Sequence, residues 1–416
     1  MRLRFGIGLG LALITGAGLL LAGISATFWL FKLLGILFGI LVLLPGGLLL
    51  SWLIGSGRPD SRTEMSMETW QVVDDGLHNA FTDLIFWREY YWLVYVSSPS
   101  HFRSEQSRVV LLRSSDARSW QEVRKFDGAG QDIRDPKLGI IQGQLFVYAL
   151  LNKSFDPEPY RTLVTHSQDG LVWAPLEAVV PDGWLLGRSI ALPDGSWVAP
   201  AHRIDQGTVV LLRTTDGSHW SIYSTIFSGS VEEHADETAI QLMENGCMLA
   251  VSRLESGSSL FGSEQAATLI SIAEPPFTSW SRSNRSAVTR LDGPNLFSLR
   301  NRLYAVGRSQ PNQAATAQVP EKPGTRTKHG SVFGRKRTAL FQVDEERLEL
   351  IHLTDLPSSG DTAYAGAVVR DAKIIISYYS NDPQSDYPWL LGMLLPSRIQ
   401  ISMLDLPSQK TQKDER

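Results

Sequence analysis

The chain has 416 residues, of which 20% are charged and 43% hydrophobic, with one cysteine and a formal net charge of −4. This composition excludes a disordered chain, a collagen-like fibre and a disulfide-rich scaffold, because the single Cys247 has no partner for an intrachain disulfide. The slight excess of acidic residues also argues against a nucleic-acid partner, which usually meets a basic domain.

The first 59 residues are far more apolar than the rest of the chain. Their only charged side chains are Arg2, Arg4, Lys32 and Arg58, so two long stretches contain no ionisable group. Each stretch exceeds the roughly 20 apolar residues that a helix needs to cross a bilayer. The sequence therefore predicts a transmembrane helical hairpin over 1–57, with a tight turn at Lys32, followed by a linker over 58–67.

Two other interpretations of this segment are a secretory signal peptide and a buried core hairpin. The first apolar stretch is too long for a signal peptide, and so much uninterrupted apolar length has little place in a soluble fold. Two passes place Arg2, Arg4, Arg58 and Arg62 on one side against Lys32, and the positive-inside bias would make that side cytoplasmic. A single pass would place the remaining chain outside, so the predicted localisation is a membrane with its side left open.

Beyond residue 59 a short pattern repeats. It consists of Ser or Thr, any residue, Asp, Gly or Ala, two further residues and Trp, and it occurs at 114–120, 167–173 and 214–220. Each copy follows a strand-like apolar run, and a degenerate fourth copy ends at Trp280. The hydroxyl and carboxylate can bond backbone amides across a tight turn, where Gly permits a positive φ. The pattern predicts braced hairpins rather than an active site.

This pattern resembles the Asp box of sialidases and related β-propellers. The strand-like runs sort into six units of about 50 residues, a period expected for propeller blades. The sixth unit has only three strands, and 68–73 could supply the fourth, closing the ring and protecting the sheet edges. The sequence thus predicts an all-β, six-bladed propeller of sialidase type over 68–406, and a polar tail over 407–416.

Candidate site residues follow from this arrangement. Blade starts and the ends of second strands should meet at one end of the central channel, on the face away from the Asp boxes. The candidates at these positions are Asp83, Arg134, Asp135, Arg188, Glu237, Arg253, Arg308 and Tyr364. Converging charges cost desolvation unless they pair with each other or with a ligand, and paired carboxylates suit acid and base roles.

Two segments are similar to sialidase segments in more detail. One segment consists of Glu237, a strand, a turn at Gly246 and a second strand that ends at Arg253. The other consists of Tyr364 and the hairpin that follows it. The resemblance implies that Tyr364 is a nucleophile, that Glu237 is its base, and that Arg253 and Arg308 bind a substrate carboxylate.

The first two blades point to a different family of propeller glycosidases. Asp83 stands where sialidases carry an arginine, and Arg134-Asp135-Pro136 resembles a motif of the fructosidase and arabinosidase type. That resemblance implies a catalytic trio of Asp83, Asp135 and Glu237, with Arg134 and Arg188 beside the substrate. Both the tyrosine and the carboxylate nucleophile therefore stay open.

Each candidate also has a purely structural interpretation. Asp135 before Pro136 could cap a turn, Glu237 could belong to a solvated acidic loop or pair with Arg253, and Tyr364 could be a packed aromatic. Because Arg337 could replace Arg308, that assignment is also open. A basic insertion over 309–338 is expected on the site face, either as a surface loop or as a lid for an acidic ligand.

The predicted function is a membrane-anchored, sialidase-like glycoside hydrolase that removes terminal sugars from a glycan or glycoconjugate. The alternative is a non-catalytic propeller that serves as a binding scaffold at the membrane, since a fold does not fix a function. No cofactor is expected. His166, His202 and His219 do not have the spacing of metal ligands, so no metal is expected either.

Overall fold

The computed structural model describes residues 15–21, 29–54, 65–152, 159–179, 181–230, 232–257, 260–310 and 328–405. The chain divides into two compact units, Met1–Arg58 and Pro59–Arg416. The predicted tail over 407–416 lies outside the described residues.

The N-terminal unit contains helical residues 15–21 and the helix α2 (Trp29–Ile54). The two segments are in contact through small residues, since a Cβ atom added to Gly39 would lie 2.8 Å from the Cβ of Leu20. Lys32 lies inside α2, so the prediction of a turn at this residue is wrong. Lysine is a good helix former, and one charge between apolar stretches does not end a helix.

Among the residues whose side chains are described, no helix has the length and hydropathy needed to cross a membrane. The transmembrane hairpin therefore stays a prediction.

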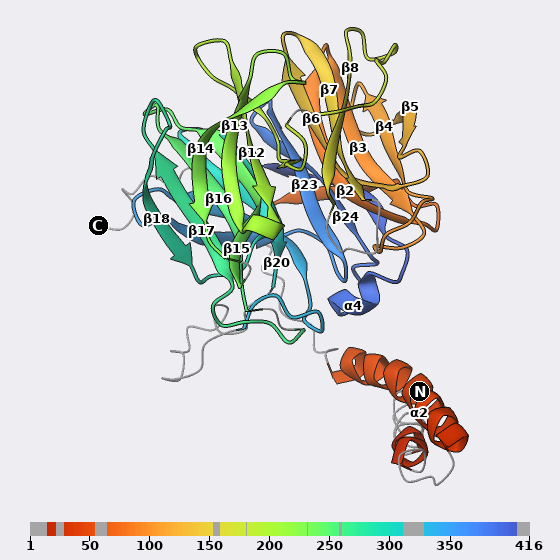
Figure 1. Ribbon diagram of the computed structural model, residues 1–416. Coiled ribbons are helices and arrows are strands. Elements are labelled where there is room, and N and C mark those ends of the chain that lie inside the picture. Colours follow the sequence, from red (N-terminus) through yellow and green to blue (C-terminus); the bar gives the residue numbers. More distant parts are fainter. Residues whose placement is uncertain are drawn as a thin grey trace. The chain divides into compact units, whose positions relative to one another are not determined.

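The second unit is a β-propeller, in which the described residues form six antiparallel sheets (Figure 1). The first blade comprises β2 (His78–Trp87), β3 (Tyr90–Ser98), β4 (Arg108–Ser114) and β5 (Gln121–Asp127). The second comprises β6 (Asp132–Ile141), β7 (Gln144–Asn152), β8 (Arg161–Ser167) and β9 (Glu177–Ala178). The third comprises β10 (Leu185–Leu186), β11 (Ile190–Ala191), β12 (Trp197–Arg203), the 3₁₀ helix η1 (Ile204–Gln206), β13 (Thr208–Thr214) and β14 (Trp220–Ser228).

The remaining blades follow in chain order. The fourth comprises β15 (Glu233–Leu242), β16 (Met248–Ser256), β17 (Ala267–Ala273) and β18 (Trp280–Ser286). The fifth comprises β19 (Asp292–Leu299), β20 (Arg302–Ser309), β21 (Arg337–Asp344) and β22 (Glu349–Asp355). The sixth comprises β23 (Thr362–Arg370), β24 (Lys373–Ser380), the short helix α4 (Trp389–Gly392), β25 (Arg398–Asp405) and β1 (Met67–Val73). The all-β, six-bladed prediction is confirmed.

The ring closes with strands from both ends of the propeller sequence. Strand β1 pairs antiparallel with β25, from Met67 opposite Leu404 to Val73 opposite Ile399. Trp70 of β1 also donates its indole N–H to the carbonyl of Ala117 in the first blade, at 3.0 Å. This strand thus completes the sixth sheet and holds it against the first, as the sequence predicts.

The Asp boxes brace hairpins between third and fourth strands. In the first blade, Asp116 Oδ1 accepts the backbone N–H groups of Arg118 and Ser119, both at 2.8 Å. The Trp120 indole N–H reaches back to the carbonyl of Ala117 at 3.0 Å. The boxes at 167–173 and 214–220 repeat these contacts. Because alternate apolar side chains of the strands pack between neighbouring sheets, the core lies between the blades.

Candidate active site

The innermost strands of five blades are irregular at the same point, near their first residues. Each first strand has one extra residue there relative to its partner strand. These shifts of register lie between Ala80 and Asp83, Arg134 and Lys137, Ala235 and Thr238, Asp292 and Asn295, and Ala363 and Gly366. Asp135 and Tyr364 lie in these bulges with φ angles of 47° and 44°. Because a bulge re-aims side chains, the repeated irregularity directs blade-start residues toward the mouth of the channel.

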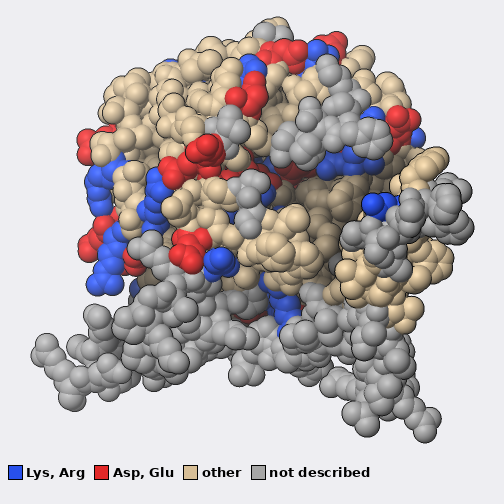
Figure 2. All heavy atoms as spheres, turned by 60° about the horizontal axis from the view of Figure 1, so that its bottom comes forward, with Lys and Arg blue, Asp and Glu red and all other residues tan. Residues whose placement is uncertain are grey.

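A cavity of about 450 Å³ lies at this mouth. It is lined by residues of all six blades, including Arg134, Asp135, Asp236, Glu237, Arg253, Arg308 and Tyr364. Loops that follow second strands add His101 and Trp389, the latter from α4, so the cavity opens on the face away from the Asp boxes. Figure 2 views this face obliquely, and acidic and basic side chains alternate on it rather than forming one patch. A second cavity of about 280 Å³ lies in the channel and shares Asp135, Glu237 and Tyr364.

Tyr364 and Glu237 are in direct contact. The phenol of Tyr364 donates a short hydrogen bond to Glu237 Oε1, and Glu237 Oε2 accepts the backbone N–H of Gly293 at 2.7 Å. Burial, together with the charge of Glu237, raises the pKa of Tyr364 well above its usual value. Burial is the largest single influence on Glu237 and opposes its ionisation, but the Arg253 guanidinium 3.3 Å away, the hydrogen bond from Tyr364 and the charge of Arg308 together lower the pKa of Glu237. A neutral phenol therefore faces an ionised carboxylate.

The two predicted anion-binding arginines are already paired with carboxylates. Arg253 contacts Glu237, Asp236 at 3.7 Å and Asp292 at 3.4 Å, and it also bonds Glu255. Arg308 is 1% exposed and is held by Asp292 at 3.0 Å and Asp361 at 3.1 Å. The guanidinium of Arg308 also lies 5.2 Å from the ring centre of Tyr364 and 4.3 Å from that of Trp389. A substrate carboxylate would have to exchange with these internal partners.

Two acids that organise this centre, Asp292 and Asp361, are not among the residues that the sequence predicts for the site. Asp292 is buried and accepts hydrogen bonds from Arg290 and Arg308. Arg290, Arg253 and Arg308 overcome the cost of burial and hold the pKa of Asp292 well below its usual range. Both acids stand just before the bulges of the fifth and sixth blades, a position that the blade-start argument could have included.

Asp83 and Arg188 are brought together, but away from the mouth cavity. Asp83 is 1% exposed, forms an ion pair with Arg188, and accepts the backbone N–H groups of Leu84 at 2.9 Å and Leu138 at 2.8 Å. The two residues line the channel cavity rather than the mouth cavity. In this blade the bulge holds Phe81, and Asp83 lies just after it. The contacts of Asp83 with Leu138 and Arg188 join the first three blades, which gives Asp83 a structural role.

Asp135 lies at the boundary of both cavities, and its neighbour Arg134 lines the mouth. Asp135 forms an ion pair with Lys137, whereas Arg134 pairs with the buried Asp132. Burial raises the pKa of Asp135 despite the nearby Lys137 charge. The structure therefore places beside Tyr364 and Glu237 a second carboxyl group whose pKa is raised rather than lowered.

The predicted basic lid is only partly described, since 311–327 lie outside the described residues. In the described part, Arg335 and Arg337 bind Asp386, at 2.7 and 2.6 Å. Lys336 is 2% exposed. These three residues therefore do not form a solvated basic surface. Arg335 and Arg337 are paired with Asp386, and Lys336 is buried.

No protein-family model and no curated protein matches the chain. Among solved structures, a Dyadobacter fermentans protein of unknown function is 16% identical, with a TM-score of 0.61 over 84% of this chain and 100% of that one. The phage phi92 endosialidase is 9% identical, with a TM-score of 0.60 over 85% and 71% of the two chains. The NanB sialidase of Streptococcus pneumoniae is 12% identical, with a TM-score of 0.52 over 81% and 70%. At these identities the likeness concerns the fold alone, which is the six-bladed propeller fold of the sialidases.

Proposed function

We propose that the protein is a sialidase-like glycoside hydrolase that uses Tyr364 as its nucleophile. The observation that carries this proposal is the hydrogen bond from the Tyr364 phenol to the ionised Glu237, at a cavity large enough for a ligand. Nucleophile and base within hydrogen-bond reach, with the base oriented by a third group, form the usual signature of covalent catalysis. Arg253 and the Gly293 N–H orient Glu237 here.

The proposed reaction has two steps. The Tyr364 oxygen attacks the anomeric carbon while Glu237 takes the phenol proton, and Asp135 gives its proton to the departing glycosidic oxygen. Asp135 then takes a proton from water, the water oxygen attacks the anomeric carbon, and Glu237 returns its proton to the tyrosine oxygen. The raised pKa of Asp135 suits the acid role, because a general acid must carry a proton at the working pH.

The proposed substrate is a terminal sugar of a glycan or glycoconjugate. A carboxylate nucleophile would repel an anionic sugar, whereas a neutral phenol would not. Since Asp135, Asp236 and Glu237 already line the cavity, a tyrosine nucleophile adds no further negative charge before it reacts. An uncharged sugar would leave the internal ion pairs of Arg253 and Arg308 intact, whereas an anionic one would have to compete for them.

The experiment compares Tyr364→Phe and Glu237→Gln with the wild type on aryl glycosides, including sialosides and arabinosides. Each substitution should lower turnover at least about a thousandfold, because it removes the attacking oxygen or its base. Tyr378→Phe is the matched control, since the Tyr378 hydroxyl bonds Pro357 and Ser402 and does not line either cavity. A 2-fluoro sugar should label Tyr364 in the wild type, as seen by mass spectrometry. Full turnover by Tyr364→Phe would contradict the mechanism.

The scaffold function is a second candidate, favoured by the internal pairing of Arg253 and Arg308. A site whose charges already satisfy each other needs no substrate to compensate them. A wild-type chain that binds glycans on an array but hydrolyses none of the panel would establish this alternative.

We also propose that the apolar segment 1–57 anchors the protein in a membrane. Its two long stretches without an ionisable group support this localisation. The full chain should remain in the membrane pellet after alkaline carbonate washing, whereas a chain that begins at residue 59 should be released. Release of the full chain by carbonate would contradict the anchor.

A further inference from the structure

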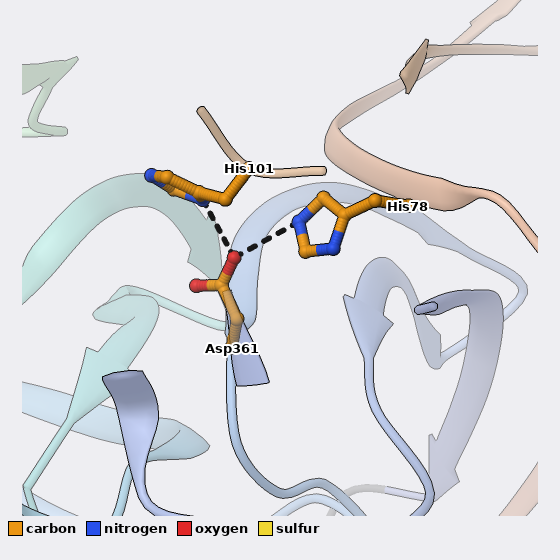
Figure 3. A group of neighbouring side chains, drawn as sticks. All are labelled: His78, His101 and Asp361. Carbon is orange, nitrogen blue, oxygen red and sulfur yellow. Dashed lines mark hydrogen bonds and ion pairs between the residues drawn. The ribbon is translucent and has the colours of Figure 1, made fainter. Parts of the chain in front are cut away.

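Two histidines and an aspartate meet beside Arg308, although 283 residues separate His78 from Asp361. Asp361 Oδ2 lies 2.6 Å from His101 Nδ1 and 3.1 Å from His78 Nε2, and these three atoms lie within 4.8 Å of one another. Figure 3 shows the two rings turned toward the same carboxylate oxygen from different parts of the chain. The proposed hydrolysis assigns none of the three a role.

The surroundings of His78 are unusual for a neutral imidazole. Its Nδ1 lies 2.8 Å from the carbonyl oxygen of Leu395, and its Nε2 faces Asp361 Oδ2, so both ring nitrogens meet acceptors. A neutral imidazole can donate only one hydrogen. If Nδ1 donates to Leu395 in this buried ring, the Nε2 lone pair faces Asp361 Oδ2, and a cation between the two atoms would bind both of them. Metal-bound histidines characteristically donate their other N–H to a carbonyl, as Nδ1 can here.

The environment of Asp361 also matches that of a metal-binding carboxylate. Its Oδ1 accepts hydrogen bonds from Trp389 Nε1 at 2.8 Å, Tyr379 Oη at 3.0 Å and Arg308 at 3.1 Å. These three donors fix the carboxylate and leave Oδ2 facing the imidazoles. A ligating carboxylate is usually held in this way by hydrogen bonds to its second oxygen.

A small cavity adjoins the two rings. It has a volume of about 10 Å³ and is lined by His78, His101 and Ser98. The Ser98 hydroxyl is buried there and has no hydrogen-bond partner within the described part of the chain. A space of this size holds about one water molecule. A water in this cavity would satisfy Ser98 and would lie beside both imidazoles, whereas Asp361 does not line the cavity.

We propose that His78 Nε2, His101 Nδ1 and Asp361 Oδ2 bind a divalent transition-metal ion of the zinc class. Two imidazoles and a carboxylate suit such ions, whereas Ca²⁺ and Mg²⁺ prefer oxygen ligands. Zn–ligand bonds of about 2.0–2.1 Å place ligand atoms about 3.3 Å apart, so the His101–Asp361 contact would have to widen. The His101 side chain is 18% exposed and follows β3 in a loop, which allows that movement. This proposal does not depend on glycoside hydrolysis.

The test uses Zn²⁺ with the full-length wild-type chain, stripped by a chelator and reloaded. Equilibrium dialysis with elemental analysis should give one tightly bound zinc per chain, and Co²⁺ in its place should give the visible absorption of a four-coordinate site. His101→Ala should bind zinc at least about tenfold more weakly. His219→Ala is the matched control, because His219 forms an exposed pair with Asp216 at 2.8 Å, and this variant should bind zinc like the wild type.

Three results would overturn the proposal: a wild type that binds no stoichiometric zinc, unchanged affinity in His101→Ala, or an equal loss in His219→Ala. The first result would mean that His78, His101 and Asp361 form a metal-free hydrogen-bond network. Zinc-soaked wild-type crystals give a measurement that does not depend on the folding of any variant. Their anomalous signal should place one peak between His78, His101 and Asp361, and a zinc peak only elsewhere would also refute the site.

Discussion

Two half-buried carboxyl groups at the mouth of the channel have opposite electrostatic surroundings. Glu237 faces Arg253, which lowers its pKa against the effect of burial, whereas burial raises the pKa of Asp135 although Lys137 is bonded to it. Two titratable groups whose pKa values are pushed apart in this way can take the base and the acid role respectively. The assignment of Asp135 as the acid leads to a prediction about pH.

We expect kcat/KM of the wild type to fall as the pH rises through the pKa of Asp135, because only the protonated form can serve as the acid. Since this pKa is raised, the fall should occur above the usual range of an aspartate. Asp135→Asn should remove this limb of the profile, and it should slow substrates with poor leaving groups far more than activated aryl glycosides. Identical alkaline limbs in the two proteins would rule out Asp135 as the acid.

The contacts of Asp83 predict a structural rather than a catalytic effect. Asp83→Ala leaves the guanidinium of Arg188 without its buried partner and removes the acceptor of two backbone N–H groups. Breaking a buried ion pair from one side costs about 3–5 kcal/mol. Urea unfolding should show a loss of this size, compared with less than about 0.5 kcal/mol for Asp205→Ala, which removes an exposed pair with Arg203. Nearly equal losses would contradict the structural role.

At the scale of elements, each face of the propeller has its own repeated local structure. The Asp-box turns join third and fourth strands on one face, and bulges in the first strands present residues on the other. Backbone N–H groups of Ser119 and Arg118, with the Ser114 hydroxyl, lower the pKa of Asp116 to about 2. The carboxylate form is therefore the one that braces the turn.

This turn predicts a pH-dependent contribution to stability. Because the pKa of Asp116 is lower in the folded state, its contribution is present above about pH 4 and is lost as the pH falls toward 2. Asp116→Ala should lower the free energy of unfolding by about 1 kcal/mol at pH 7, the size expected for an exposed turn, and by less at pH 3. Urea unfolding at both pH values measures the difference, with the exposed neighbour Ser115→Ala as control. A constant difference would show that ionisation of Asp116 is not involved.

At the scale of the whole molecule, the ring depends on β1. This strand covers the edge of β25 and contacts the first blade through Trp70 and through the ion pair of Glu68 with Arg118. An uncovered edge strand is a template for aggregation.

A chain that begins at residue 59 keeps β1, and one that begins at residue 76 lacks it. We expect the first to be monomeric by size-exclusion chromatography and to unfold in one cooperative transition. The second should aggregate or melt at a markedly lower temperature, because the edge of β25 is exposed. Equal melting temperatures and elution volumes would contradict a closing role for β1.

Short stretches of the sequence determined the features that depend on local chemistry. The Asp-box turns, the strand period and the closing strand could be predicted, because turn hydrogen bonds and side-chain alternation are encoded within a few residues. The pair Tyr364 and Glu237 was implied only by the resemblance to sialidase segments. The residue at which α2 begins could not be predicted, because the single charge of Lys32 does not end a helix.

Only the tertiary structure decided which charged residues meet. It paired Asp83 with Arg188, and it paired Arg253 and Arg308 with acidic residues of the protein itself. It also placed His78 and His101 against the same carboxylate oxygen of Asp361. Asp83 and Arg188 come from different blades, as do Arg253 and Asp292, whereas Asp292 and Arg308 lie opposite each other within the fifth blade. The bulges set which side chain enters the mouth. Long-range contacts and one-residue shifts of register leave no periodic trace in the sequence, so the chemistry of the site was fixed by packing rather than by any motif.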